Sequence, residues 1–306
     1  MSLSVDFGRA TTPPRPQTRQ NRTPTEQEIF DLELQRIDND RFNLPYAIHL
    51  IGSSVAGIRK VITQKYEDTK HGTQYLKFSN IPPNIASKYI SKGCRQSYDA
   101  SSRILIITIP GRIHNSAALH FAFALQTAIV EANLEDETQA TGSGRVKGNM
   151  CYKEPDGSWI PSTPPPTDDT WPSIVVEVAY SESSQRLHLD ASWWLANSQG
   201  EVKVVILIFV DQERAKLTFE SIINSQPIIT LRNGRPRFQP VTRQKIEVSR
   251  PPGGSTMPVS CMPAEPLHVS SEELLRRAPV PPETDADISV QSLIKVATKI
   301  WNIQHV

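Results

Sequence analysis

Short β-branched runs alternate along the chain with longer segments whose apolar residues recur every three or four positions. Residues 104–109 form the clearest run, which ends at Pro110 and Gly111 and predicts a buried strand. Residues 114–135 have the spacing of a long helix with a broad apolar face. The pattern therefore predicts strands and helices within one core.

Residues 173–210 repeat this alternation. Residues 173–179 and 202–210 are strand-like, and the amphipathic segment 186–198 between them predicts a helix. Strand, helix and strand within this length fit a βαβ unit with a right-handed crossover, if the two strands are parallel. We therefore expect an α/β fold in which helices flank a mixed central sheet.

Weaker patterns surround these segments. Residues 270–277 and 290–302 predict helices, and the second helix either packs on the core or contacts a partner protein. The remaining expectations are strands at 48–51, 75–78, 158–160 and 216–221, edge strands at 228–231 and 245–248, and a helix that opens at Thr25.

Composition suggests that part of the chain is not packed. The 306 residues include 25 prolines, a share above the usual ~5%. Residues 1–24 are rich in Pro, Thr, Gln and Arg and cannot bury enough apolar surface to offset the entropy of ordering, so we expect a disordered arm. The expected organisation is an arm over 1–24, a helix and accessory segment over 25–97, a core over 98–249, and a loop with a helical extension over 250–306.

Charge, cysteine spacing and hydropathy exclude several classes of protein. With 33 Lys and Arg against 32 Asp and Glu, no global field attracts nucleic acid or a membrane, although a local basic groove stays open. Cys94, Cys151 and Cys261 are far apart, which argues against a disulfide scaffold and a structural zinc site. No apolar leader or membrane-length run is present, so we expect an intracellular protein, cytoplasmic or nuclear and not secreted.

Two acidic residues stand out by their positions. Asp156 lies in a Pro-Asp turn, and Glu177 lies inside the valine-rich strand predicted over 173–179. A carboxylate in a strand covered on both faces must be paired, hydrogen-bonded or metal-bound, because an unpaired buried charge costs several kcal/mol or more. Composition leaves open whether Glu177 serves a functional site, forms a structural ion pair or faces solvent from an edge.

Three motifs carry a family resemblance. They are PDGSWIP at 155–161, WPSIVVEVAYSES at 171–183 and LDASWWLANSQGEVKVVILI at 189–208. Together they resemble the PD-(D/E)XK nuclease-like superfamily, in particular its Uma2-type branch and the fungal restriction-endonuclease-like relatives. The resemblance covers about residues 98–222 and includes an upstream helix that contains a histidine.

The resemblance implies a restriction-endonuclease-like core that hydrolyses phosphodiesters of DNA or another nucleic acid with Mg²⁺ or Mn²⁺. Asp156 and Glu177 match the metal-binding acids of the family, and the backbone carbonyl of Val178 matches a further ligand. Mg²⁺ prefers oxygen ligands, and such an ion polarises the phosphate and lowers the pKa of an attacking water.

The sequence differs from the family motif at the position of the motif lysine. Ala179 stands two positions after Glu177, where the motif has lysine. Lys153 and Lys203 are the candidate catalytic substitutes. The helix after the strand offers Arg186, which can hold a phosphate but transfers protons poorly because it stays charged.

Other residues have two readings each. Arg145 and Lys147 follow a Gly-Ser turn and either line a nucleic-acid channel or belong to a solvated loop. His114 and His120 are six residues apart, which does not suit a two-histidine metal pair, so each fits a cap or a packed side chain. The resemblance keeps His120 as a residue at the edge of the site.

Two features of the helix predicted after the valine strand have a simpler expected role. Asp190 could approach the two acids or face water, and the second is the one we expect. The pair Trp193 and Trp194 is expected to pack the helix, because consecutive helical residues point about 100° apart.

Three functions stay open at this point. The first is a metal-dependent nuclease, and the second is a catalytically inactive nuclease-fold protein that binds or interacts. The third is a scaffold for partner proteins or a homodimer that uses the tails and the C-terminal helix.

Overall fold

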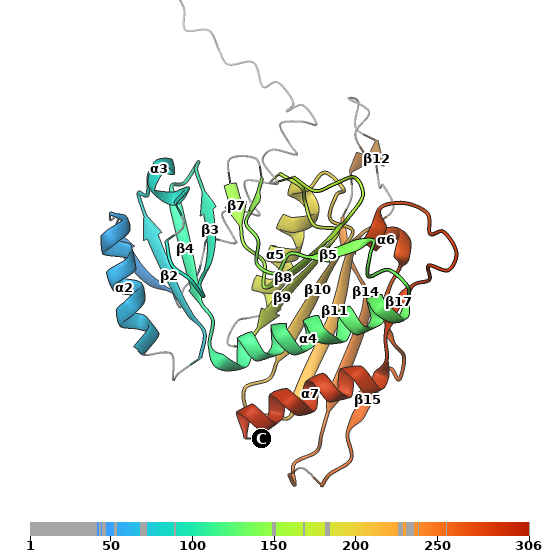
Figure 1. Cartoon of the computed structure of the whole chain (residues 1–306). Coiled ribbons are helices and arrows are strands. Elements are labelled where there is room, and N and C mark those ends of the chain that lie inside the picture. Colours follow the sequence, from blue (N-terminus) through green and yellow to red (C-terminus); the bar gives the residue numbers. More distant parts are fainter. Residues whose placement is uncertain are drawn as a thin grey trace, which may run out of the picture.

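Two β-sheets with helices packed against them make up the protein (Figure 1). The computed structural model describes residues 42, 44, 47–51, 54–67, 72–88, 90–148, 151–167, 169–180, 184–225, 229–230, 236–237, 239–254 and 256–305. The arm expected over 1–24 and the helix opening at Thr25 lie outside the described residues. The mixed α/β architecture with helix-flanked sheets is the one expected.

The first sheet has six strands. Its order is β1 (Ile48–Ile51), β2 (Gln74–Ser79), β4 (Ile104–Ile109), β3 (Arg95–Asp99), β7 (Cys151–Lys153) and β6 (Val146–Lys147). Helices α2 (Val55–Glu67) and α3 (Pro83–Ala86) supply apolar side chains to one core with this sheet, which includes Ile58, Leu76 and Leu105.

The second sheet has seven strands. Its order is β15 (Ser260–Met262), β14 (Pro240–Ser249), β11 (Lys216–Asn224), β10 (Val204–Val210), β9 (Ile174–Ala179), β8 (Gly157–Pro161) and β5 (Thr138–Ala140). Two short pairs, β12 (Ile229–Thr230) with β13 (Pro236–Arg237) and β16 (Leu267–Val269) with β17 (Ala286–Ile288), complete the strands.

Helices cover both faces of the seven-stranded sheet. On one face, Val176 and Val178 of β9 share a core with α4 (Arg112–Glu131) and α7 (Val290–Gln304). On the other face, Val175 and Ala179 share a core with α5 (Ser184–Asn197). Because successive strand residues point to opposite faces, Glu177 points toward α5, into the buried interior.

The segment 173–210 forms the expected βαβ unit. β9 and β10 are parallel, with Ile174 opposite Val204, and α5 connects them. β11 then pairs antiparallel with β10 as a hairpin partner. These are the segments with the strongest hydrophobic periodicity, and local pattern was sufficient to predict them.

Several weaker expectations need correction. The boundary expected at residue 97 falls inside β3, so the accessory segment and the start of the expected core share one sheet. Residues 245–248 belong to β14, which lies between β11 and β15 and is not an edge strand.

The C-terminal helices complete the core. One face of α7, which includes Ile300 and Trp301, is buried beside α4. This helix therefore packs on the core, and that face is closed to a partner. The short helix α6 (Ser271–Leu275) is capped by Ser270, whose side chain accepts a hydrogen bond from the Glu273 N–H. Within the described residues, no helix has the length and apolar content to cross a membrane.

Candidate active site

The candidate site lies where the two sheets meet. β7 belongs to the first sheet and β8 to the second, and the three residues between them include Glu154 and Asp156. A small cavity of about 30 Å³ opens at this junction, with room for one or two water-sized groups. Its polar lining comes from separate elements: Arg95 and Ser97 of β3, His114 of α4, Lys153, Glu154, Asp156, Glu177, and Arg186 and Asp190 of α5.

Two basic side chains and one backbone N–H hold Asp156. Nε2 of His114 lies 3.3 Å from Oδ2, and Nε of Arg95 lies 3.5 Å from Oδ1. The backbone N–H of Val178 donates to Oδ2 at 3.0 Å. A strand residue directs its N–H and C=O to the same neighbour, so we expect the Val178 carbonyl on this side of β9 as well.

Two donors hold Glu177. Nζ of Lys153 lies 2.9 Å from Oε1, and the indole N–H of Trp194 donates to the same oxygen at 2.6 Å. Lys153 itself is buried, with 8% of its side chain exposed, and it also lies 3.4 Å from Oδ1 of Asp190. A lysine from β7 thus stands beside the β9 acid, although the sequence position expected for a lysine holds Ala179.

One face of α5 completes this side of the cavity. Arg186, Asp190 and Trp194 recur every four residues, so they share a helix face. Nε of Arg186 lies 3.3 Å from Oδ2 of Asp190. The sequence expectation that Asp190 faces water is wrong, because its side chain is only 6% exposed and lies within the ion-pair network.

The two acids have opposite pKa shifts. Burial disfavours ionisation of Asp156, but the charge and hydrogen bond of His114, the guanidinium of Arg95 and a backbone N–H outweigh burial and lower the pKa to about 2. Burial raises the pKa of Glu177 to about 7. Lys153 opposes that rise, whereas the negative charge of Asp156 adds to it, which is consistent with both carboxylates lining one cavity.

The structure separates the two candidate lysines. Lys153 lies in the cavity, whereas the Lys203 N–H donates to the Ser173 carbonyl at the far end of β9. Ser173 is four positions before Glu177 along the strand, roughly 13 Å away at about 3.3 Å per residue. Lys203 is therefore not brought to the site.

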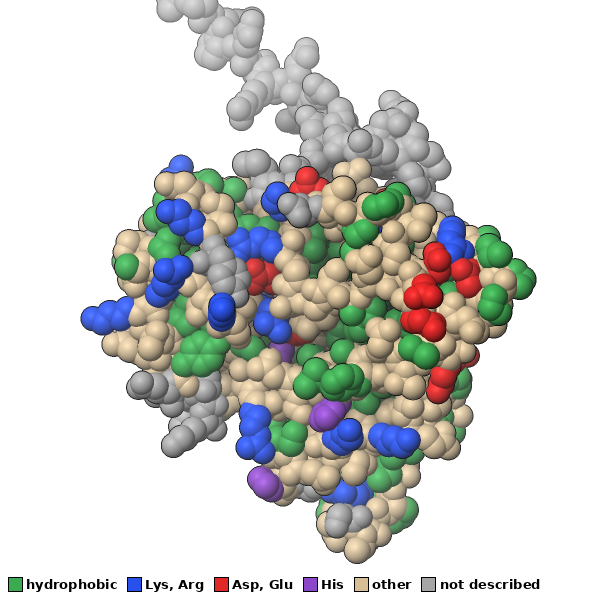
Figure 2. Space-filling view, in the orientation of Figure 1, with side chains coloured by type: hydrophobic (Ala, Val, Ile, Leu, Met, Phe, Trp, Pro, Cys, Tyr) green, Lys and Arg blue, Asp and Glu red, His purple; other side chains and the backbone are tan. Residues whose placement is uncertain are grey.

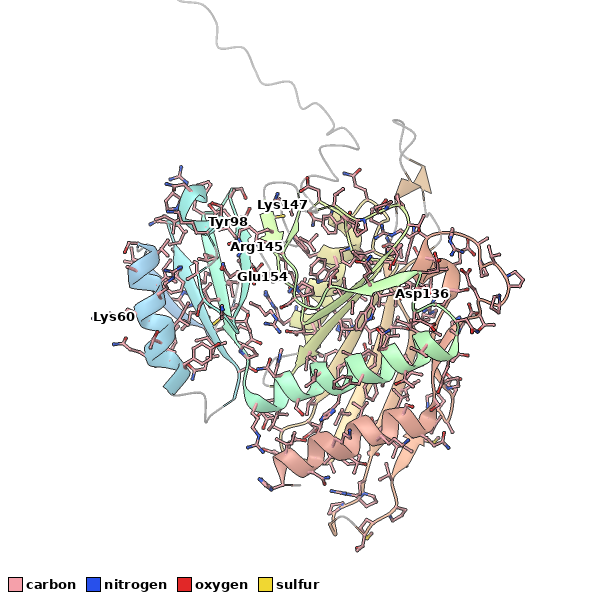
Figure 3. The ribbon with its side chains drawn as sticks, viewed as in Figure 1. Lys60, Tyr98, Asp136, Arg145, Lys147 and Glu154 are labelled. Carbon is pink, nitrogen blue, oxygen red and sulfur yellow. The ribbon has the colours of Figure 1, made fainter. Side chains whose placement is uncertain are left out.

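Of the three residues expected to bind phosphate, one lines the cavity and two do not. Arg186 lines the cavity. Arg145 is held by Glu154, with Nη2 2.8 Å from Oε1, and lies 4.2 Å above the Tyr152 ring, whereas Lys147 is exposed and 3.3 Å from Asp169. Figure 3 shows Arg145, Glu154 and Lys147 together at the junction of the sheets.

Sequence reasoning missed three contributors. His114 and not His120 reaches the site, since His114 lies in the first turn of α4 and His120 is not among the residues lining the cavity. Arg95 lies in a segment to which no chemistry was assigned. Trp194 does pack the helix as expected, but its indole N–H also donates to Glu177. The spacing of Arg186, Asp190 and Trp194 was the one available signal.

The donor set suits a hard divalent cation. Mg²⁺ is commonly held by one or two carboxylates, with waters and phosphate oxygens in the other positions, and Asp156 and Glu177 line one cavity with the Val178 backbone. The described part of the chain has no group of three His, Cys, Asp or Glu side chains that would form a metal site from protein ligands alone.

Comparisons with known proteins give a distant structural likeness. No family model and no curated protein matches the chain. A similar solved structure is that of a nuclease candidate of the DUF820 group from Anabaena variabilis, with a TM-score of 0.38 and 12% sequence identity. The likeness covers 66% of this chain and 90% of the other.

Proposed function

We propose that the protein is a metal-dependent phosphodiester hydrolase that acts on nucleic acid at the junction of its two sheets. The observation that carries this proposal is Nζ of Lys153 at 2.9 Å from Glu177, in the cavity that Asp156 also lines. Two acids and a lysine from three separate parts of the chain meet there, and these groups can hold a divalent ion and stabilise charge on a phosphate.

Each residue has a role in this proposal. Asp156, Glu177 and the Val178 carbonyl would hold Mg²⁺ or Mn²⁺, which when bound polarises the phosphate and lowers the pKa of a coordinated water. Lys153 orients the attacking water and offsets negative charge that develops on the phosphate. Arg95 and His114 keep the Asp156 carboxylate ionised and fix its orientation.

A second function is favoured by a different observation. Within the described residues, each buried carboxylate of the cavity has a basic or histidine partner: Glu154 has Arg145, Asp156 has Arg95 and His114, Glu177 has Lys153, and Asp190 has Lys153 and Arg186. Such a compensated network suits a catalytically inactive binding protein on the same fold, in which the ion pairs only hold the sheets together.

A nicking assay with a matched pair of lysine variants separates the two functions. Supercoiled DNA and a single-stranded RNA are incubated with Mg²⁺ or Mn²⁺ and wild-type protein, Glu177→Gln, Lys153→Met or Lys203→Met. The hydrolase proposal expects losses of about 10²-fold or more for the first two variants and near wild-type activity for Lys203→Met. If wild-type and Glu177→Gln proteins cut equally, or if the wild type cuts neither substrate, the hydrolase proposal is rejected in favour of the binding function.

A further inference from the structure

The charge of the chain is unevenly distributed over the fold. Residues 48–112 contain ten Lys and Arg against three Asp and Glu, whereas the whole chain has 33 against 32. These residues form β1 to β4 with α2 and α3, which we call the basic lobe. Figure 2 shows Lys and Arg side chains spread over this lobe, while Asp and Glu side chains gather at the opposite end, near α6 and β17.

Three lysines of the lobe are available to a ligand. Lys60 on α2 and Lys88 and Lys92 before β3 are exposed, and none of them has an acidic partner among the described residues (Figure 3 shows Lys60 on the outer side of the lobe). At the acidic end, by contrast, Arg277 is paired with Glu283 at 2.6 Å. An unpaired cluster of one sign attracts a polyanion through the release of its counterions.

The lobe is connected to the cavity. The loop from Ser87 to Cys94, which carries Lys88 and Lys92, leads into β3, and β3 supplies Arg95 to the cavity lining. Nη1 of Arg145 donates to the Ser87 carbonyl at 3.0 Å, and the Gln96 amide donates to the Lys88 carbonyl at 3.4 Å. The basic loop is therefore fixed to the rim of the site and its cations do not form an isolated patch.

We propose that the basic lobe is a docking surface for the phosphodiester backbone of a nucleic acid, with Lys88 and Lys92, just before β3, among its contacts. This proposal rests on the proposed function for its substrate but not on catalysis, because backbone binding needs no metal. The recognition is electrostatic and sequence-independent. It also assigns affinity to residues outside the segment whose motifs resemble nucleases.

The test measures binding without cleavage. Fluorescence anisotropy of labelled duplex DNA, single-stranded DNA and RNA of equal length is recorded with the full chain in EDTA, between about 50 and 200 mM salt. The variants are Lys88→Gln with Lys92→Gln, and a charge-matched control, Lys295→Gln with Lys299→Gln, on the exposed side of α7. Thermal unfolding confirms that both double variants fold.

The lobe variant should bind roughly tenfold more weakly at the lowest salt concentration, and its log–log salt slope on duplex DNA should fall by about 1.8, at about 0.9 per phosphate contact. The control variant should bind like the wild type. Equal weakening in both double variants, or no binding of any of the three nucleic acids by the wild type, would overturn the proposal. If the wild type does not cut nucleic acid but the lobe variant still binds more weakly than the wild type, the hydrolase proposal is rejected and the docking surface is supported.

Discussion

Glu177 depends on two donors from different elements. Lys153 of β7 and the indole N–H of Trp194 of α5 both lie against Oε1. A fully buried carboxylate stays ionised only where such donors compensate for lost hydration, and the pKa of about 7 shows that the compensation here is partial. Trp194 therefore acts as a positioning residue for the acid, in addition to its packing against α5 neighbours.

Replacing Trp194 with Phe tests this hydrogen bond. Trp194→Phe should lower the free energy of unfolding by about 1–3 kcal/mol more than Trp301→Phe, because a hydrogen bond to a charged group is lost as well as volume. Trp301 is a suitable control, since it is fully buried and its indole nitrogen has no hydrogen-bond partner among the described residues. Urea unfolding measures both losses, and equal values would contradict the role given to Trp194.

At the scale of elements, α5 is also tied to the seven-stranded sheet away from the cavity. Nε2 of His188 lies 2.8 Å from Oε2 of the buried Glu220 on β11, and Lys245 of β14 lies 2.8 Å from Oε1. The hydrogen bond that His188 donates to Glu220 raises the pKa of His188 against the effect of burial, and it lowers the pKa of Glu220. Together they link α5 to two strands through charge.

This link predicts a pH dependence of stability. A raised histidine pKa stabilises the fold below the usual value near 6.5, and that stability is lost as pH rises through the raised pKa. The lowered pKa of Glu220 stabilises the fold above its usual value of about 4.5. The pair therefore contributes most to stability between about pH 4.5 and 6.5. His188→Gln should remove up to about 1 kcal/mol near pH 5.5, because His188 is 41% exposed, and should change little at pH 9. A constant difference across pH would refute the link.

A second element-scale prediction concerns α7. Ile300→Ala should cost about 2–5 kcal/mol of unfolding free energy, since Ile300 is fully buried against the α4 side of the core. Lys299→Ala, one residue earlier on the exposed side, should cost under about 0.5 kcal/mol. Chemical denaturation compares them. A small loss for Ile300→Ala would mean that α7 is a detachable extension, as one reading of the sequence allowed.

The elements with strong periodicity were predictable, and their pairing was not. The strand over 104–109, the helix from 114 and the unit over 173–210 followed from local patterns of apolar residues. The split of the strands into two sheets depends on pairings distant in sequence, such as Ser97 with Lys153, which no local pattern encodes. The expected boundary at residue 97 failed for this reason.

The site was predictable to a similar extent. Asp156 and Glu177 followed from a turn and from a charge inside an apolar strand, and Lys153 was one of two candidate lysines. Arg95 and His114 could not be found, because their role depends on where β3 and α4 meet Asp156 in space. Charge counted over the whole chain also concealed the basic lobe, whose excess of cations is offset by acids elsewhere.

At the scale of the whole molecule, the fold places a buried acid pair and a lysine at the junction between two sheets, and the basic lobe borders that junction through β3. The central claim is that Asp156 and Glu177 together hold a divalent ion there. Their opposite pKa shifts fit two neighbouring acids, of which one stays ionised and the other gives up its proton near neutral pH.

Calorimetric titration of the full chain with Mn²⁺ at pH 8, in the absence of nucleic acid, tests this claim most directly. The account predicts one ion per chain and binding weakened by about tenfold or more in both Asp156→Asn and Glu177→Gln. Lys203→Met, at the far end of β9, should bind like the wild type. Absence of binding by wild-type protein, or equal affinity in the wild type and the two acid variants, would contradict it.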